Sequence, residues 1–311
     1  MKKILKIFMV LVVMLLGTSS IVSATENKKD VAINKQNFPD NYLRSYLSEI
    51  FDDNNDGILQ QNEISNVQYI PLDMSGEYTG HNDMNGQDNI NCKGLSYFKN
   101  LKYLVLIGGS NKAKIYNINE IEGLTKLTSL YISSNRKACN LDLSKLKKLE
   151  ELRLDSFKKL NKLKFRKNIK NLYLAGLSGN ATLDLSKQKY LDEVELRYIN
   201  LKKIYFGKNK YINSLYIYSE REIKNKKTKM IDVSNLKNLE KLYIVDFQNL
   251  KTVKLGKNKK LTDISVYRCK KVKKINVKKC KNVQNMYLGK KIKVLKNKKQ
   301  KIKVKRYKYR E

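Results

Sequence analysis

The sequence predicts an α/β solenoid, in which parallel β-strands stack coil upon coil behind a small helical cap at the N-terminal end. Three observations support this fold class. An apolar spacing of Leu-x-x-Leu-x-Leu recurs from Leu101 onward, with Ile, Val, Phe or Met in place of some Leu residues. Successive elements alternate between two sequence classes, so one coil is two half-turns of about 22 residues in total. A twelve-residue loop rich in Asp and Asn precedes the repeats.

The repeat spacing explains how a core forms. In each Leu-x-Leu the two apolar side chains point inward and x points to solvent, so every coil adds one strand and a share of a continuous core. One class carries Leu-Asp-Leu-Ser, at 141–144 and 183–186, and the other carries Leu-Tyr-Ile or Leu-Tyr-Leu. Coils of this length are typical of leucine-rich repeats.

We expect about nine coils between Leu101 and Gly289, with a charged insertion at 219–229. A bundle of long amphipathic helices is the alternative, but the abundance of Tyr, Ile and Val favours strands.

The N-terminal residues are typical of a secretion signal. Three lysines precede an apolar run at residues 7–16, and small polar residues and Val22-Ser23-Ala24 follow it. We expect cleavage after Ala24. This run is too short to span a bilayer, and no later segment approaches the roughly 20 apolar residues of a membrane helix. We divide the chain into the signal peptide at 1–24, an EF-hand-like helical cap at 25–70, a bridging segment at 71–100, the solenoid at 101–289 and a basic strand or tail at 290–311.

Residues 52–63 match a complete EF-hand calcium loop, which follows a predicted amphipathic helix. Gly57 occupies the sharp turn of that loop, and Gln60 can act through a water molecule. The expected oxygen ligands of calcium are Asp52, Asn54, Asp56, the carbonyl of Ile58 and bidentate Glu63. The alternative is a helical cap that covers the first coil without holding a metal.

Charge restricts the class of partner. The chain carries 65 basic and 29 acidic residues, a net charge of +36, and loses three lysines with the predicted signal. Such a positive field favours anionic partners. Because the protein is expected to be exported, nucleic acid is a weaker candidate than anionic lipid, wall polymers or sulfated glycans. Residues 290–311 hold ten Lys and two Arg against Glu311. This segment has two compatible interpretations: a closing strand whose lysines prevent end-to-end stacking, or a tail that retains the protein on wall polymers.

No constellation of catalytic residues is visible. The single histidine, His81, lies in a polar segment, and no glycine-rich phosphate loop is present. Asp142, Asp184 and Asp232 recur at one repeat position, which indicates turn chemistry rather than an acid and a base. Cys269 and Cys280 each follow the last apolar position of a repeat, where we expect a buried structural role. The four cysteines of the chain are too few for a disulfide scaffold. The sequence therefore predicts a binding protein, not an enzyme.

Aromatic residues recur at the outward position of one repeat class. In order, this position holds Tyr131, Arg153, Tyr173, Glu195, Tyr216, Tyr243, Ser265 and Tyr287. Tyrosine and arginine dominate the energetics of many interfaces, so we predict that Tyr131, Arg153, Tyr173, Tyr216, Tyr243 and Tyr287 form a ligand-binding face. The alternative, left open, is that the rings only cover the sheet.

Taken together, four features resemble the secreted leucine-rich-repeat proteins of Gram-positive bacteria, including the internalin-like group. They are the segment 33–40, the loop at 52–63, the bridge at 93–101 and the Leu-Asp-Leu-Ser repeats. The resemblance implies a solenoid with a helical cap, exposed at the cell surface and often used in adhesion. It suggests a protein or glycan ligand on a host or neighbouring cell. The chain lacks a Leu-Pro-x-Thr-Gly sorting signal, since its only prolines are Pro39 and Pro71. We therefore expect a secreted monomer that is retained at the wall by non-covalent contacts.

Overall fold

The computed structural model describes residues 29–75, 88–110, 112–134, 139–157, 160–176, 182–199, 201, 203–219 and 228–307. The predicted signal peptide, His81 and most of the charged insertion at 219–229 lie outside these residues. Within them, no helix has the length and apolar character needed to cross a membrane.

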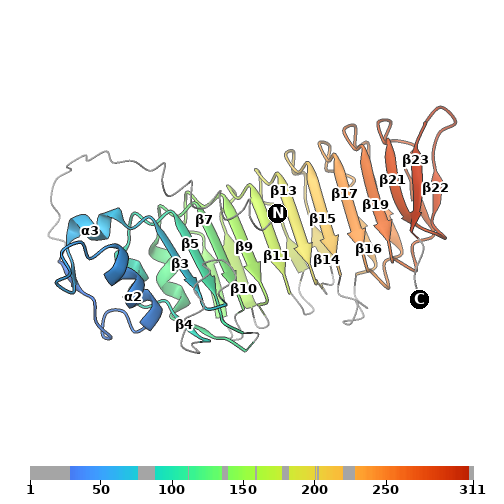
Figure 1. The fold of residues 1–311 in the computed structure, drawn as a ribbon. Coiled ribbons are helices and arrows are strands. Elements are labelled where there is room, and N and C mark those ends of the chain that lie inside the picture. The colour runs from blue at the N-terminus through green and yellow to red at the C-terminus, as the bar shows by residue number, and fades with distance from the viewer. Residues whose placement is uncertain are drawn as a thin grey trace.

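The molecule is an elongated solenoid with a small cap at its N-terminal end (Figure 1). The cap contains β1 (Val31–Ala32), α2 (Asn41–Ile50), β2 (Ile58–Leu59) and α3 (Gln61–Asn66). Asp40 begins α2, because its Oδ1 accepts a hydrogen bond from the backbone N–H of Leu43 at 3.0 Å. Its Oδ2 accepts another from the N–H of Asn91 at 2.9 Å, which ties the cap to the first coil. Phe38 is fully buried and stacks on Phe98 at a centroid distance of 6.0 Å.

One side of the solenoid is a parallel sheet of eleven strands (Figure 1). These sheet strands are β3 (Tyr69–Asp73), β5 (Tyr103–Ile107), β7 (Ser129–Ser133), β9 (Glu151–Asp155), β11 (Asn171–Ala175), β13 (Glu193–Arg197), β15 (Ser214–Tyr218), β17 (Lys241–Val245), β19 (Asp263–Tyr267), β21 (Asn285–Gly289) and β23 (Lys303–Tyr307). They pair in sequence order and in one register, so that Leu152, Leu172 and Val194 lie side by side.

The other side is built from back strands, which pair only in twos. They are β4 (Ile90–Asn91), β6 (Ile115–Tyr116), β8 (Cys139–Leu143), β10 (Leu160–Phe165), β12 (Thr182–Asp184), β14 (Lys203–Tyr205), β16 (Met230–Asp232), β18 (Thr252–Lys254), β20 (Lys274–Asn276) and β22 (Lys293–Leu295). Two 3₁₀ helices, η1 (Leu95–Tyr97) and η2 (Ile118–Gly123), lie in the first coils. The apolar side chains between the two sides form one continuous buried cluster, from Val31 to Ile292.

The predicted solenoid is confirmed. Sheet strands β17, β19 and β21 begin at residues 241, 263 and 285, a repeat of 22 residues. Nine of the described sheet strands, β5 to β21, lie between Leu101 and Gly289, as predicted. The sheet also extends beyond those limits, because β3 and β23 join it at its two ends.

Candidate functional site

The outward side chains of the eleven sheet strands form a surface that we call the sheet face. Because the strands are in register, equivalent residues lie in rows across the sheet. The middle row contains Pro71, Val105, Tyr131, Arg153, Tyr173, Glu195, Tyr216, Tyr243, Ser265, Tyr287 and Lys305. All six residues predicted to bind a ligand lie in this row, on the same side of the protein.

The middle row contains two stacks of side chains. The guanidinium of Arg153 lies between two rings, 4.5 Å from the centroid of Tyr131 and 4.2 Å from that of Tyr173. Tyr216 and Tyr243 stack with centroids 4.9 Å apart and ring planes 20° apart. Adjacent strands are about 4.8 Å apart, so rings at the same register position meet at stacking distance.

A second row lies two residues further along each strand and adds aromatic residues near the C-terminal end. Tyr267 stacks on Tyr307 at 4.9 Å, and both rings meet Tyr287 edge-on, at 5.3 and 5.9 Å. Arg197 reaches the ring of Tyr218 at 5.2 Å. The aromatic surface is therefore wider than the predicted stripe.

The tyrosines of the middle row remain partly exposed. Tyr131, Tyr173, Tyr216 and Tyr243 are half-buried, and Tyr287 is 37% exposed. Burial raises the pKa of Tyr173 and of Tyr243, so their hydroxyl groups remain protonated at neutral pH. Each hydroxyl can then both donate and accept a hydrogen bond. These rings support the sheet and also present polar contact groups.

The sheet face carries almost no net charge, although the whole chain carries +36. Its outward basic residues are Arg153, Arg197, Lys241, Lys303 and Lys305. Its outward acidic residues with exposed area are Glu151, Asp155, Glu193, Glu195 and Asp263, while Asp73 is fully buried. The five positive charges therefore balance the five negative charges of this surface, and the excess positive charge of the protein lies elsewhere.

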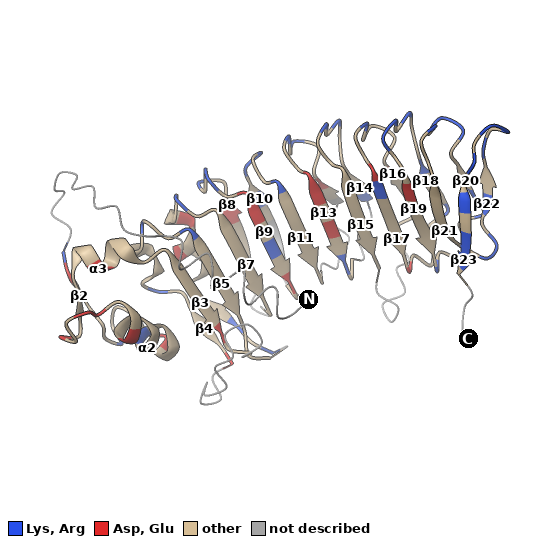
Figure 2. Cartoon of the chain, turned by 45° about the horizontal axis from the view of Figure 1, so that its top comes forward, with Lys and Arg blue, Asp and Glu red and all other residues tan. Residues whose placement is uncertain are grey.

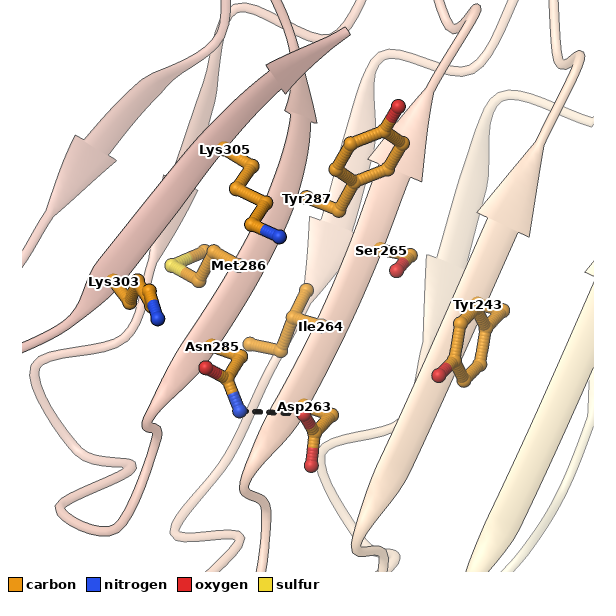
Figure 3. Close-up of a pocket in the computed structure, with 9 residues that line it drawn as sticks. All are labelled: Tyr243, Asp263, Ile264, Ser265, Asn285, Met286, Tyr287, Lys303 and Lys305. Carbon is orange, nitrogen blue, oxygen red and sulfur yellow. Dashed lines mark hydrogen bonds between the residues drawn. The ribbon is translucent and has the colours of Figure 1, made fainter.

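A hollow of about 210 Å³ interrupts the middle row at Ser265 (Figure 3). Its walls include Tyr243 on one side and Tyr287 on the other, with Lys303 and Lys305 at the C-terminal end. It exists because serine is small and because both tyrosines contact rings elsewhere: Tyr243 stacks on Tyr216, and Tyr287 meets the rings of the second row edge-on. The only sequence signal for it was one serine in a row of large side chains.

The predicted calcium loop adopts a tight conformation. Asp52 accepts hydrogen bonds from the backbone N–H of Asp56 at 3.1 Å and of Gly57 at 3.0 Å. Gly57 has a φ of 78°, a left-handed conformation that favours glycine. The two carboxylate oxygens of Glu63 accept from the N–H groups of Asp53 and Gln60, at 2.9 and 2.8 Å. The loop is also held from outside, since β2 pairs with β1 in an antiparallel register.

The donor set of this loop fits calcium. Asp52 and Glu63 are only 5% and 3% exposed, and no ion pair among the described residues involves either carboxylate. Burying two anionic groups without a positive partner is costly, and calcium prefers oxygen ligands of this kind. However, no three His, Cys, Asp or Glu side chains of the described residues converge closely enough to hold a metal. To hold a cation together with Asp52, Asn54, Asp56 and the carbonyl of Ile58, Glu63 would have to leave the amides of Asp53 and Gln60.

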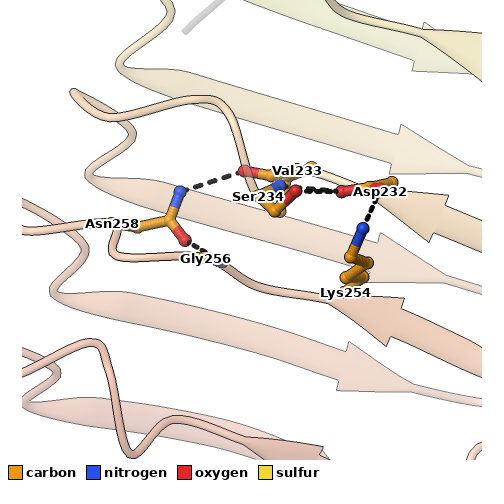
Figure 4. Close-up of polar contacts among 6 residues, drawn as sticks. All are labelled: Asp232, Val233, Ser234, Lys254, Gly256 and Asn258. Carbon is orange, nitrogen blue, oxygen red and sulfur yellow. Dashed lines mark hydrogen bonds and ion pairs between the residues drawn. The ribbon is translucent and has the colours of Figure 1, made fainter.

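The recurring aspartates take part in turn formation, as predicted. Oδ1 of Asp232 accepts from the backbone N–H of Ser234 at 3.0 Å and from its hydroxyl at 2.6 Å, while Oδ2 pairs with Lys254 at 2.9 Å (Figure 4). Asp142 and Asp184 accept from the N–H two residues ahead in the same way. Hydrogen bonds from Ser186 hold the pKa of Asp184 below its ordinary value.

Cys269 and Cys280 are buried and satisfy backbone carbonyl groups. The Sγ of Cys269 donates to the carbonyl of Tyr267 at 3.3 Å, and that of Cys280 donates to the carbonyl of Gly256 at 3.4 Å. Burial raises the pKa of Cys269 to about 12, which keeps it a thiol. Both residues have the structural environment that the repeat position predicted.

Comparison with known proteins gives fold similarity only. No protein-family model matches the chain, and no curated protein sequence does. Similar solved structures include the functional domain of InlJ from Listeria monocytogenes, which includes a cysteine ladder. It is 14% identical to this chain, with a TM-score of 0.45. The match covers 88% of this chain and 63% of the InlJ domain. Two internalins of Listeria monocytogenes strain 4b F2365 are also similar. InlF is 17% identical, with a TM-score of 0.38, and the match covers 92% of this chain and 100% of InlF. InlC2 is 13% identical, with a TM-score of 0.45, and the match covers 91% of this chain and 100% of InlC2. Identities and TM-scores this low give no information about the ligand of this chain.

Proposed function

We propose that this protein is a binding protein that recognises a protein or glycan ligand through its sheet face. The observation that carries the proposal is the pair of stacks in the middle row, Arg153 between Tyr131 and Tyr173, and Tyr216 on Tyr243. Tyrosines held by stacking lose little conformational entropy on binding, while their edges and hydroxyl groups supply apolar and polar contacts. A near-neutral surface also avoids the cost of desolvating many like charges.

The hollow at Ser265 gives this face a place for one protruding group of the ligand. Tyr243 supplies an aromatic wall, and Lys303 and Lys305 supply positive charge at one end. Ligand groups that fill concave sites contribute most when water is excluded around them. We place the centre of the interface between Tyr216 and Tyr287.

We also propose that the protein is exported, acts in adhesion at the cell surface and holds one calcium ion in its cap. The N-terminal lysines and apolar run support export. The buried carboxylates of Asp52 and Glu63 support the ion. Because Asp40 and Phe38 join the cap to the first coil, calcium would stabilise the end of the solenoid without contacting the ligand.

A screen of glycans and cell-surface proteins, with and without calcium, provides the ligand for the decisive comparison. One variant replaces Tyr173, Tyr216 and Tyr243 with serine. A matched control replaces Tyr190, Tyr205 and Tyr211 with serine. These three tyrosines are 48%, 43% and 53% exposed and lie off the sheet face. We expect the first variant to lose at least tenfold in affinity and the control to bind normally.

A third variant separates recognition from packing. Replacing Tyr173, Tyr216 and Tyr243 with phenylalanine preserves the rings and removes only the hydroxyl groups. We expect it to keep its melting temperature and to lose part of its affinity. If the serine variant unfolded, and the phenylalanine variant bound as well as the unmodified protein, the rings would serve the sheet and the proposal would be wrong.

A further inference from the structure

The excess positive charge of the protein is concentrated on one edge of the solenoid. Eight turns lead from a back strand into the next sheet strand: 144–150, 166–170, 185–192, 206–213, 233–240, 255–262, 277–284 and 296–302. They carry 21 Lys and Arg residues, all exposed, against three acidic residues, Glu150, Asp192 and Glu240. We call this edge the lysine ridge, and Figure 2 shows it as the blue turns along the top.

The last three turns of the ridge are the most basic. They contain ten lysines and no acidic residue: Lys257, Lys259, Lys260, Lys278, Lys279, Lys281, Lys296, Lys298, Lys299 and Lys301. None of these lysines belongs to the ion pairs found among the described residues. Stacked coils are about 4.8 Å apart, which is less than the Debye length of about 8 Å at physiological salt. The fields of neighbouring turns therefore add.

Hydrogen bonds between coils hold these turns in place. The carbonyl of Lys259 accepts from Asn282 at 2.7 Å, and that of Lys278 accepts from Asn297 at 2.8 Å. The buried Asn258 bonds to the carbonyl of Val233 in the preceding coil (Figure 4). The backbone that displays the lysines is fixed before any partner arrives, which lowers the entropy lost on binding.

The shape and composition of the ridge favour one kind of partner. Eight stacked turns extend over roughly 34 Å, so a linear molecule can contact them all. Of its 21 basic residues only Arg166 is an arginine, and lysine binds phosphate as a point charge without demanding a planar geometry. The last three turns contain no aromatic residue, so they offer no stacking platform for nucleic-acid bases.

We propose that the lysine ridge binds a linear polyol phosphate, a phosphodiester-linked polymer without nucleobases, which lies along the solenoid axis with its strongest contacts on the last three turns. The sequence suggested such a contact for the segment 290–311, but only four of the ten lysines lie there. The other six come from the two preceding turns. The ridge is distinct from the sheet face, so the two proposals can fail separately.

The test measures binding of purified poly(glycerol phosphate) across a salt series. The ridge variant replaces Lys257, Lys259, Lys279, Lys281, Lys298 and Lys299 with glutamine. The control replaces Lys251, Lys270, Lys271, Lys273, Lys290 and Lys291, six exposed lysines in the turns of the opposite edge. The two variants have the same net charge.

We expect the ridge variant to lose at least tenfold in affinity and about 4 units of the slope of log K against log salt, since each lost phosphate contact removes about 0.7. The control should stay within threefold, and so should the serine variant of the sheet face. Equal losses in both lysine variants would overturn the proposal, because binding would then follow net charge alone. Tighter, ridge-dependent binding of heparin or single-stranded DNA would overturn the choice of polymer.

Discussion

Replacing Asn258 with alanine should lower the free energy of unfolding of the solenoid more than replacing an exposed side chain does. The Asn258 side chain is fully buried. Its amide donates to the carbonyls of Val233 at 3.0 Å and Leu236 at 2.6 Å, and its oxygen accepts from the N–H of Gly256 at 2.8 Å. Three hydrogen bonds contribute about 1 kcal/mol each. The carbonyls of Val233 and Leu236 keep the backbone N–H groups of Leu236 and Leu239 as donors, so we expect the free energy of unfolding to fall by about 3 kcal/mol.

Equilibrium unfolding in urea, followed by circular dichroism, measures this change. Asn282→Ala is the matched control, because Asn282 is exposed and donates one hydrogen bond, to the carbonyl of Lys259. It should lose about 1 kcal/mol. Equal losses in the two variants, or a loss below about 1 kcal/mol for Asn258→Ala, would refute the view that buried amides join the coils.

Three further outcomes follow from the cap, the last strand and the hollow. Calorimetry should detect one calcium site in the unmodified protein and none in Glu63→Gln, and equal, undetectable heats at millimolar calcium would leave the loop as a structural cap. Truncation after Gly289 removes β23 and exposes the edge of β21, so light scattering should show self-association; a stable monomer would contradict the role of β23 as a closing strand. Ser265→Tyr should fill the hollow, stabilise the sheet by roughly 0.5–1.5 kcal/mol through stacking and weaken ligand binding. An unchanged affinity would show that the ligand does not occupy the hollow.

The sheet and its middle row could be predicted from the sequence because a strand has a period of two residues. Once Leu152 and Leu154 point inward, Arg153 must point outward, and the shared register aligns it with Tyr131 and Tyr173. The same spacing is present earlier in the chain at Val67, Ile70 and Leu72, and it would have placed the start of the sheet correctly. The C-terminal strand was harder to recognise, since Arg306 occupies an inward position and donates to the carbonyl of Ile292 at 2.5 Å.

The hollow and the lysine ridge could not be predicted in the same way. The hollow depends on the directions in which Tyr243 and Tyr287 lean, and those directions are set by their stacking partners. The ridge depends on which of the two turns of each coil lies on which edge of the solenoid, and that placement comes from the boundaries of the strands. For the loop at 52–63, the calcium ligands remain a prediction from the sequence pattern, and that pattern could not show that Glu63 bonds to the amides of Asp53 and Gln60.

Photo-cross-linking on ligand-bearing cells tests the central claim most directly. A photoreactive phenylalanine analogue would replace Tyr243, in the middle row of the sheet face, or Tyr205, which is 43% exposed on the back strand β14. We predict a specific cross-link from position 243 and none from position 205. Cross-linking from position 205 alone, or equally from both positions, would contradict the claim that the sheet face binds the ligand.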